Sequence, residues 1–225
     1  MILLNFIALV NYNLRGTDDD APAEGDADWN YWATLANTRK TTMYRDIKKR
    51  WSSSWDDDHE VGTIAVATKP TFNLGESFVE ASDKLLITLT DGREKEIDIV
   101  EPQERSSYKF QAFIYGMHPQ KLRLSKAIET GSEYIGATIT LPGFYVPDDM
   151  TITDPNAIVP VDDPIWLAME VAAAVAFNNI TYEDKFADLK GQANDLYKQM
   201  EAVNKSRPRG NAATTPVNVT KITGF

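Results

Sequence analysis

The sequence predicts an α+β protein: a helical domain, made from N-terminal helices and a C-terminal helix pair, with an inserted small antiparallel β domain (barrel or sandwich) and an extended C-terminal tail. Apolar residues recur at helical spacing near both ends of the chain. The middle instead alternates short apolar runs with turn residues. We therefore expect residues 1–60 and 150–205 to form the helical domain, residues 61–149 the β domain, and residues 206–225 the tail.

The first helix is expected at the N-terminus, where apolar residues recur at helical spacing. They are Ile2, Leu3, Phe6, Leu9, Val10 and Leu14. No basic residue precedes this run and no small-x-small cleavage site follows it, so we do not expect a signal peptide. An acidic loop, residues 16–28, comes next, and Asp28 at its end is a good helix N-cap.

A long helix is expected from Trp29 to Trp51, because this stretch lacks Gly and Pro and carries an apolar stripe. Its last turns are basic, which suits the negative end of a helix dipole. The basic cluster comprises Arg39, Lys40, Arg45, Lys48, Lys49 and Arg50. Two interpretations stay open, a face that contacts DNA or an acidic partner and an ordinary solvated helix face.

Short strands are expected through the middle of the chain, separated by Gly, Pro and Ser. The candidates are residues 63–67, 72–74, 84–90, 93–100, 110–115, 121–124 and 134–141. Asp91 and Gly92 lie between two of these runs and predict a tight hairpin turn. About six short strands are enough for a small barrel or sandwich.

Helical patterning returns after a crossing segment rich in Pro and Asp. Asp162 or Asp163 can cap a helix whose first position is Pro164, where the missing N–H costs nothing. The helix continues to Asn178 and is apolar nearly all round, with Glu170 as its lone charge. Such a helix is buried on all sides, so we expect it at the centre of the helical domain or in a subunit interface.

The last helix is expected to begin after Thr181, with Asp184 three residues later as a weak capping box. Its apolar residues recur at helical spacing, and it ends near Lys205. They are Phe186, Leu189, Ala193, Leu196, Tyr197 and Met200.

Composition excludes several classes of function. Cysteine is absent and histidine occurs only at His59 and His118, which rules out disulfides, thiolate zinc sites and metal sites built on several imidazoles. The net charge of −10, from 33 acidic and 23 basic residues, does not fit a protein that grips nucleic acid by many phosphate contacts. No apolar stretch approaches the ~20 residues of a membrane span, and no Gly-rich phosphate loop is present. We expect no cofactor and no membrane partner.

Clusters of carboxylates are the remaining candidates for chemistry, and each has an ordinary surface interpretation. Asp18–Asp20 and Asp56–His59 have groups that can hold a cation, but neither has the ligand spacing of a known calcium loop. The candidate acid–base pairs are Glu94 with Glu96 and Glu101 with Glu104. Acidic residues at alternate strand positions are typical of a solvent-exposed face, so we predict no catalytic residue.

Three stretches together resemble head-to-tail connector proteins of tailed bacteriophages, also called adaptor, tail tubular or gatekeeper-like proteins. They are NYNLRGTDDDAPAEGDADWNYWATLANTRKTTMYRDIKKRW, the β block, and DPIWLAMEVAAAVAFNNITYEDKFADLKGQANDLYKQM. The likeness covers residues 2–200 and lies in the architecture: an N-terminal helix, a long helix ending in Trp51, a β insertion and two late helices.

The resemblance implies a structural protein of the virion neck that is not an enzyme. Such proteins form rings of about twelve copies beneath the portal protein and extend the DNA channel toward the next tail or nozzle protein. They hold the packaged genome and pass it on at ejection. DNA would move through without specific binding, since a negative lumen repels it. Two other classes stay open: a tail enzyme acting on carbohydrate or peptidoglycan, and a β-domain binding module.

The tail is expected to dock on a neighbouring subunit, the portal or the next tail protein. Val-Asn-Val-Thr alternates like a strand but has no partner strand beside it in the sequence, which suits addition to another sheet edge. The expected docking residues are Arg207, Arg209, Val217, Val219, Ile222 and Phe225. The alternative is a frayed terminus.

Overall fold

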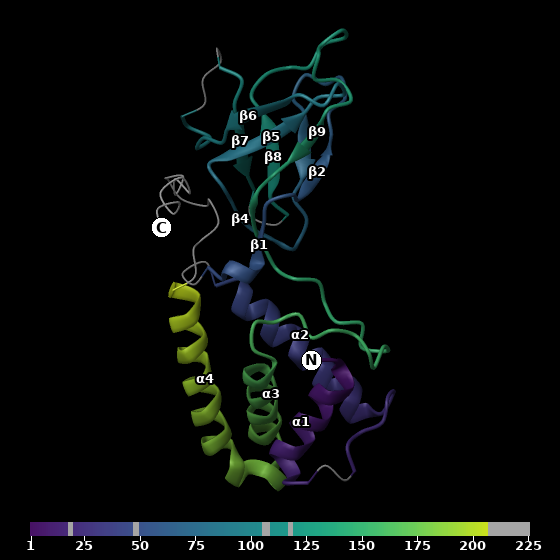
Figure 1. Ribbon diagram of the computed structural model, residues 1–225, viewed down its shortest axis with the longest axis vertical. Coiled ribbons are helices and arrows are strands. Elements are labelled where there is room, and N and C mark those ends of the chain that lie inside the picture. The colour runs from purple at the N-terminus through teal and green to yellow at the C-terminus, as the bar shows by residue number, and fades with distance from the viewer. Residues whose placement is uncertain (18–19, 47–49, 105–108, 117–118, 207–225) are drawn as a thin grey trace, which may run out of the picture. The chain divides into compact units, whose positions relative to one another are not determined.

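The computed structural model describes residues 1–17, 20–46, 50–104, 109–116 and 119–206 (Figure 1). It confirms the α+β class: helices come first, antiparallel sheets occupy the middle of the chain, and a helix pair follows. The tail beyond Ser206 lies outside the described residues.

The backbone forms two compact units. The helical unit is built from Met1–Ser53 and from the part of the chain that begins at Val146, and the β unit spans Ser54–Tyr145. The expected boundaries at 60/61 and 149/150 differ from these by several residues. The β unit begins earlier because Trp55 already pairs with Phe144 as a strand.

The helical unit is organised around one central helix (Figure 1). Its elements are α1 (Leu3–Arg15), α2 (Ala27–Tyr44), α3 (Pro164–Asn178), the 3₁₀ helix η2 (Ile180–Lys185) and α4 (Phe186–Ser206). α3 contacts α1, α2, η2 and α4. The apolar composition of α3 therefore follows from its central position, which is one of the two positions that the sequence left open, the other being a subunit interface.

α1 packs one face against the unit, as its spacing predicts. Leu3, Phe6, Val10 and Leu14 are fully buried, and so is Ile7. The helix ends at Gly16, which adopts φ 77° and donates its N–H to the carbonyl of Tyr12 at 2.7 Å. Positive φ is the usual C-terminal stop of a helix and favours glycine there.

α2 ends at Tyr44, so the predicted helix from Trp29 to Trp51 is too long. Trp51 is buried outside the helix, where its ring meets the edge of the Tyr197 ring at 5.7 Å between centroids. The side-chain amide of Asn204 accepts from the N–H of Ser52 at 2.9 Å and donates to the carbonyl of Arg50 at 2.7 Å. This pair of bonds holds a non-helical backbone, and a sequence pattern does not contain it.

The start of α3 agrees with the sequence. The Asp163 carboxylate accepts from the N–H groups of Ile165 at 2.8 Å and Trp166 at 3.2 Å, and Pro164 occupies the first helical position. The start of the next helix does not agree. Asn179, not Thr181, caps η2, and the α-helix proper begins only at Phe186.

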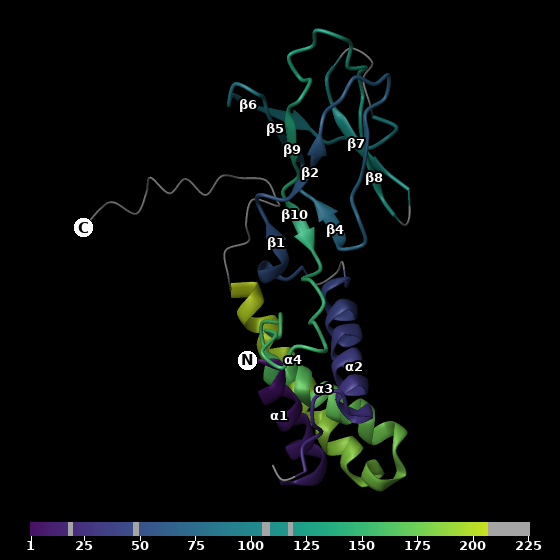
Figure 2. The same ribbon diagram turned by 90° about the vertical axis from the view of Figure 1, so that its right-hand side faces the viewer.

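The β unit contains three small antiparallel sheets, and a 3₁₀ turn, η1 (Ser52–Ser54), leads into the first strand. Figure 2 shows β1, β10 and β4 of the first sheet side by side. The first sheet has the order β1–β10–β4, the second β2–β9–β5–β6 and the third β3–β8–β7. The strands are β1 (Trp55–Asp56), β2 (Glu60–Thr63), β3 (Thr71–Asn73), β4 (Phe78–Ala81), β5 (Lys84–Thr88), β6 (Glu94–Asp98), β7 (Ala112–Tyr115), β8 (Lys121–Leu124), β9 (Thr138–Thr140) and β10 (Gly143–Tyr145).

The predicted hairpin at Asp91-Gly92 joins β5 to β6. Gly92 adopts φ 83°, and its N–H donates to the Leu89 carbonyl at 2.9 Å. The register pairs Thr88 with Glu94, which places Leu85, Ile87 and Ile97 on the same inner face.

All three sheets bury side chains in one core. The second sheet contributes Leu85 and Ile139, and the third contributes Leu122 and Leu124. Tyr145 adds its ring from the first sheet. Because the second and third sheets turn their inner faces to this shared core, their outer faces point away from it in different directions.

Candidate functional site

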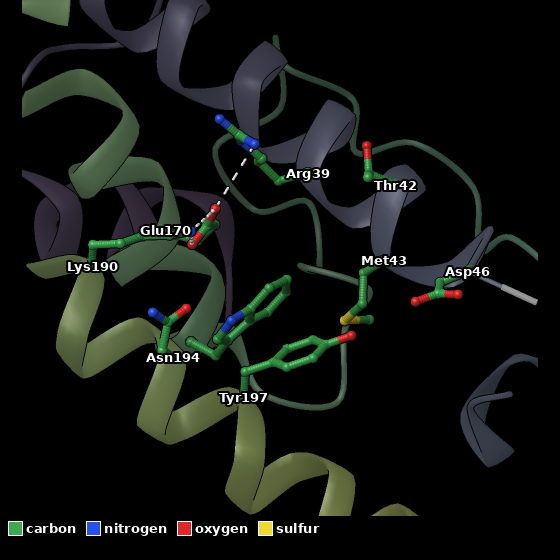
Figure 3. Close-up of a pocket in the computed structure, with 9 residues that line it drawn as sticks. Arg39, Thr42, Met43, Asp46, Glu170, Lys190, Asn194 and Tyr197 are labelled. Atoms are coloured by element: carbon green, nitrogen blue, oxygen red, sulfur yellow. Dashed lines mark hydrogen bonds and ion pairs between the residues drawn. The ribbon is translucent and has the colours of Figure 1, made fainter. Parts of the chain in front are cut away.

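A cleft of about 250 Å³ opens between α2, α3 and α4 in the helical unit (Figure 3). Helical spacing explains why its side chains converge, since residues three, four or seven apart share one face. The lining comprises Arg39, Thr42, Met43 and Asp46 from α2 and the turn after it, Trp166 and Glu170 from α3, and Lys190, Asn194 and Tyr197 from α4.

Glu170 is the charged centre of this cleft. Its two carboxylate oxygens accept from Lys190 Nζ at 2.8 and 2.7 Å, and Arg39 Nη1 lies 3.8 Å from Glu170 Oε1. The Glu170 side chain is almost buried, so its charge needs such partners to offset the loss of hydration. Glu170, the lone charged residue predicted on α3, therefore joins α3 to both α2 and α4.

Arg39 has binding capacity left over. Its side chain is 41% exposed, while its Nε is buried without a hydrogen-bond partner among the described residues. Two cations face one carboxylate at Glu170, and the rings of Trp166 and Tyr197, 5.5 Å apart, form an aromatic wall. This arrangement can hold a carboxylate from a partner against the guanidinium. Glu170 itself is not a free general base, because both of its oxygens accept from Lys190 and Arg39 lies beside it.

The six residues of the predicted basic cluster do not form one exposed surface. Lys40 is fully buried, and its ammonium donates to the carbonyls of Pro147 and Asp148 at 2.6 Å each and to the Asp149 carboxylate at 2.9 Å. Lys40 is therefore a structural cation and cannot face DNA.

The other members of the cluster are dispersed. Arg39 lines the cleft, and Arg45 and Arg50 follow the end of α2. Lys48 and Lys49 lie outside the described residues, as do the tail residues Arg207, Arg209, Val217, Val219, Ile222 and Phe225.

The predicted acidic clusters show surface pairing. His59 Nδ1 lies 3.4 Å from the Asp56 carboxylate, and the His59 ring stacks on Tyr145 with centroids 3.8 Å apart. Among the residues that the structure describes, no three His, Asp or Glu side chains meet in a way that could hold a metal ion. Asp18 and Asp19 are outside that part of the chain.

The candidate acid–base pairs lie on exposed positions. Glu96 pairs with Lys84 at 2.5 Å, and the hydrogen bond and charge of Glu96 raise the pKa of the Lys84 ammonium. Glu94, Glu101 and Glu104 are exposed as well. This placement is that of a solvated strand and turn, not of a cleft that excludes water.

Exposed apolar side chains gather where α3 meets η2, and no sequence pattern predicted them. Phe177 is 68% exposed and Ile180 is 88% exposed. Phe177 packs on Phe186, with ring centroids 5.1 Å apart. One feature of the sequence could have indicated this exposure. Phe177 and Ile180 flank two consecutive asparagines, so the apolar run continues into a polar turn. An apolar cluster in water has a cost that docking on a partner would remove.

No protein-family model matches the sequence, and no curated protein matches it. None of the helices in the described ranges is long and apolar enough to cross a membrane.

Proposed function

We propose that the protein is a structural connector of a bacteriophage virion, located at the head–tail interface after synthesis in the host cytoplasm. It forms a ring of about twelve copies between the portal protein and a downstream tail or nozzle protein. The ring extends the DNA channel, retains the packaged genome and passes it on at ejection. The function is structural and needs no active site.

The observation that carries this proposal is the exposed apolar cluster of Phe177 and Ile180 at the end of the central helix. α3 is held by α1, α2, α4 and η2, so a partner seated on this cluster would bind a rigid support. The cleft beside Arg39 adds a place for a partner carboxylate. The order of the elements, helices before and after a β insertion, supports the same family resemblance.

The excess of acidic residues fits a channel wall. With a net charge of −10 per copy, a ring of such subunits repels the phosphate backbone, so DNA slides instead of adhering. We expect the isolated protein to bind DNA weakly, without sequence preference and with strong salt sensitivity. A complex that survives high salt, or that prefers one sequence, would contradict a passive wall.

Negative-stain imaging of the purified protein, alone and mixed with the portal protein of the same phage, tests the proposal. We expect rings in at least one of the two samples. A compact monomer that cleaves glycan or peptidoglycan would establish the tail enzyme instead. A monomer that binds glycan without cleaving it would establish the binding module.

Matched variants locate the docking surface. Phe177→Ser with Ile180→Ser should abolish ring formation or portal docking and leave the folded helical unit intact. Leu4→Ser is the control, because Leu4 is also an exposed apolar residue but lies in the first turn of α1, outside the cluster. Equal assembly by both variants would show that the apolar cluster is not a docking site.

A further inference from the structure

The β unit carries opposite charges on two of its outer faces. Alternation along β8 turns Leu122 and Leu124 into the core, and Lys121 and Arg123 to the outside. Lys69 and Lys109, just before β3 and β7, and Lys126, just after β8, are exposed. We name the outer side of the β3–β8–β7 sheet, with Lys121 and Arg123 on it and the three exposed lysines next to its strands, the cationic face.

Among the described residues, no carboxylate forms an ion pair with the cationic face. Residues 61–75 and 105–128 contain no Asp or Glu. Lys69, Lys109, Lys121 and Lys126 form no ion pair within the described part of the chain. The cations near the second sheet behave differently, since Lys84 pairs with Glu96, Arg93 with Asp91, and Lys95 with Glu133.

Arg123 is fixed in the middle of the cationic face by neutral groups. Its Nε donates to the Thr71 hydroxyl at 3.2 Å and its Nη2 to the Tyr115 hydroxyl at 3.0 Å. The guanidinium carbon lies 4.7 Å from the centroid of the Tyr115 ring. These contacts order the side chain across β3, β8 and β7 and leave its charge uncompensated, which prepares it for an external carboxylate.

The second sheet presents the complementary surface. Alternation along β6 places Glu94, Glu96 and Asp98 outward and Ile97 inward, and Glu60 of β2 is exposed in the same sheet. Lys84 is the one cation on the facing strand β5, and it pairs with Glu96. We name the outer side of the β2–β9–β5–β6 sheet, with these four carboxylates, the anionic face.

We infer that the cationic face of one copy docks on the anionic face of a second copy of this chain. The two faces lie on different sides of one shared core, so the contact joins unlike surfaces head to tail and leaves one face free at each end. Copies therefore add in one direction until the assembly closes into a ring. The inference rests on the proposed function in that a ring requires such a contact.

A second copy fits the cationic face better than nucleic acid does. The chain itself supplies the carboxylates in equal copy number, and complementary charges across an interface fix the register of the partners. The overall charge of −10 opposes the approach of a phosphate backbone.

Charge exchange between two variants tests the contact. The first variant is Lys69→Glu with Lys121→Glu, which avoids the ordered Arg123; the second is Glu94→Lys with Asp98→Lys. Self-association is measured by sedimentation velocity at low salt. Each variant alone should self-associate about tenfold or more weakly than the native chain, because like charges meet at the contact. An equimolar mixture should assemble again, with the two variants alternating.

The control is Lys198→Glu with Lys205→Glu on α4, which changes the net charge as much as the first variant but lies in the helical unit. It should assemble as the native chain does. Circular dichroism and thermal unfolding establish that every variant is folded. Arg123→Lys serves as a further variant that keeps the charge and loses the fixed geometry, and it should weaken assembly by less than the first variant.

Several results would overturn the inference. If the cationic-face variant and the anionic-face variant each formed native-like rings alone, the contact between β units would be excluded. The connector proposal would not be affected by that result. Loss of binding to a short DNA duplex in the first variant, with self-association unchanged, would assign the cationic face to nucleic acid. A native chain that forms no ring by itself or with the portal protein would overturn both proposals.

Discussion

Two adjacent basic residues of α2 have different roles, which only the folded chain distinguishes. Arg39 lines the cleft beside Glu170. Lys40 is buried, and its ammonium donates hydrogen bonds to three oxygen atoms of residues 147–149. A buried ammonium is tolerated when its donors are satisfied, so Lys40 ties α2 to the segment that leaves the β unit. The sequence predicted the charges but not the burial, because their partners lie more than a hundred residues away.

Gly143 is fixed by a close approach of two strands. A Cβ atom at this position of β10 would lie 2.5 Å from the Glu80 carbonyl oxygen and 3.2 Å from Ala81 Cα. We expect Gly143→Ala to lower the free energy of unfolding by about 1–3 kcal/mol, because backbone must shift to admit the methyl group.

Gly191→Ala is the matched control. Gly191 lies inside α4 with open space around the position of a Cβ, so the same change should raise the free energy of unfolding by about 0.5–1 kcal/mol. Urea unfolding of the two variants measures both effects. A Gly143→Ala variant as stable as the native chain, or more stable, would show that the approach at Gly143 is not tight.

Tyr145 couples stability to alkaline pH. Its ring is buried and its hydroxyl donates to the Leu141 carbonyl at 2.8 Å; burial, with a smaller effect of the Asp56 charge, raises the pKa of the phenol above its ordinary value of 10.0. Its stabilising contribution is therefore complete below the unfolded pKa. It is lost as pH rises above 10.0 toward the folded pKa, by about 1.4 kcal/mol per pH unit.

Tyr145→Phe should make the free energy of unfolding less dependent on pH in this alkaline window. The variant also loses the hydrogen bond to Leu141, which costs about 1 kcal/mol at neutral pH. Tyr12→Phe, at an exposed tyrosine, is the control and should keep the native pH dependence. Parallel pH profiles of the native chain and Tyr145→Phe would exclude this role for Tyr145.

At the scale of elements, α3 determines the helical unit. Leu167, Val171 and Ala172 are fully buried among the surrounding helices, whereas Ile165 at the first turn is 47% exposed. These residues are equally apolar in the sequence, but the structure buries those in the middle of α3 and exposes the one at its start.

Leu167→Ala or Trp166→Ala should lower the free energy of unfolding by about 2–5 kcal/mol, because each leaves a cavity between packed helices. Ile165→Ala on the same helix should cost less, since its side chain already contacts water. Thermal unfolding compares them. A melting temperature of Leu167→Ala within a degree of the native value would contradict a central position for α3.

The elements that the sequence predicted are those with many consistent signals. Asp163, Pro164 and the long apolar run specify α3, and Asp91-Gly92 specifies the β5–β6 hairpin. β1, β4 and β10 were missed; they have two, four and three residues, and their pairing with one another joins residues 55–56, 78–81 and 143–145, which are far apart in the sequence. The end of α2 and the paired cleft were missed because they depend on Asn204 and Lys190, distant residues that no local pattern reveals.

On the scale of the whole molecule, the chain enters and leaves the β unit through paired strands. β1 and β10 are antiparallel neighbours with Trp55 opposite Phe144, and their rings meet edge to face at 5.0 Å. The two ends of Ser54–Tyr145 are thus held together by the unit's own contacts. An insertion of this kind can fold with few contacts to the rest of the chain.

A fragment of residues 54–145 should therefore fold by itself. We expect a cooperative thermal transition and a dispersed NMR spectrum, since the fragment keeps the whole shared core. A fragment of residues 61–145, which starts at the boundary expected from the sequence, lacks β1 and should be less stable. Two fragments of equal stability would show that β1 contributes nothing to the unit.

Deletion of residues 211–225 tests the role expected for the tail. We expect the shortened subunit to remain folded, because the helical and β units keep every buried residue described above. If the tail adds a strand to a partner, assembly on the portal or tail protein should fall sharply. Normal assembly by the shortened chain would favour a frayed terminus.

The side-by-side entry and exit of the β unit also bear on how such a chain can evolve. A coding segment bounded by β1 and β10 can be exchanged between genes as one cassette, because the acceptor needs only to provide two neighbouring chain ends. The helices and the β unit can then diverge at different rates. New surface properties can be acquired through the cassette while the helical scaffold keeps its packing around α3.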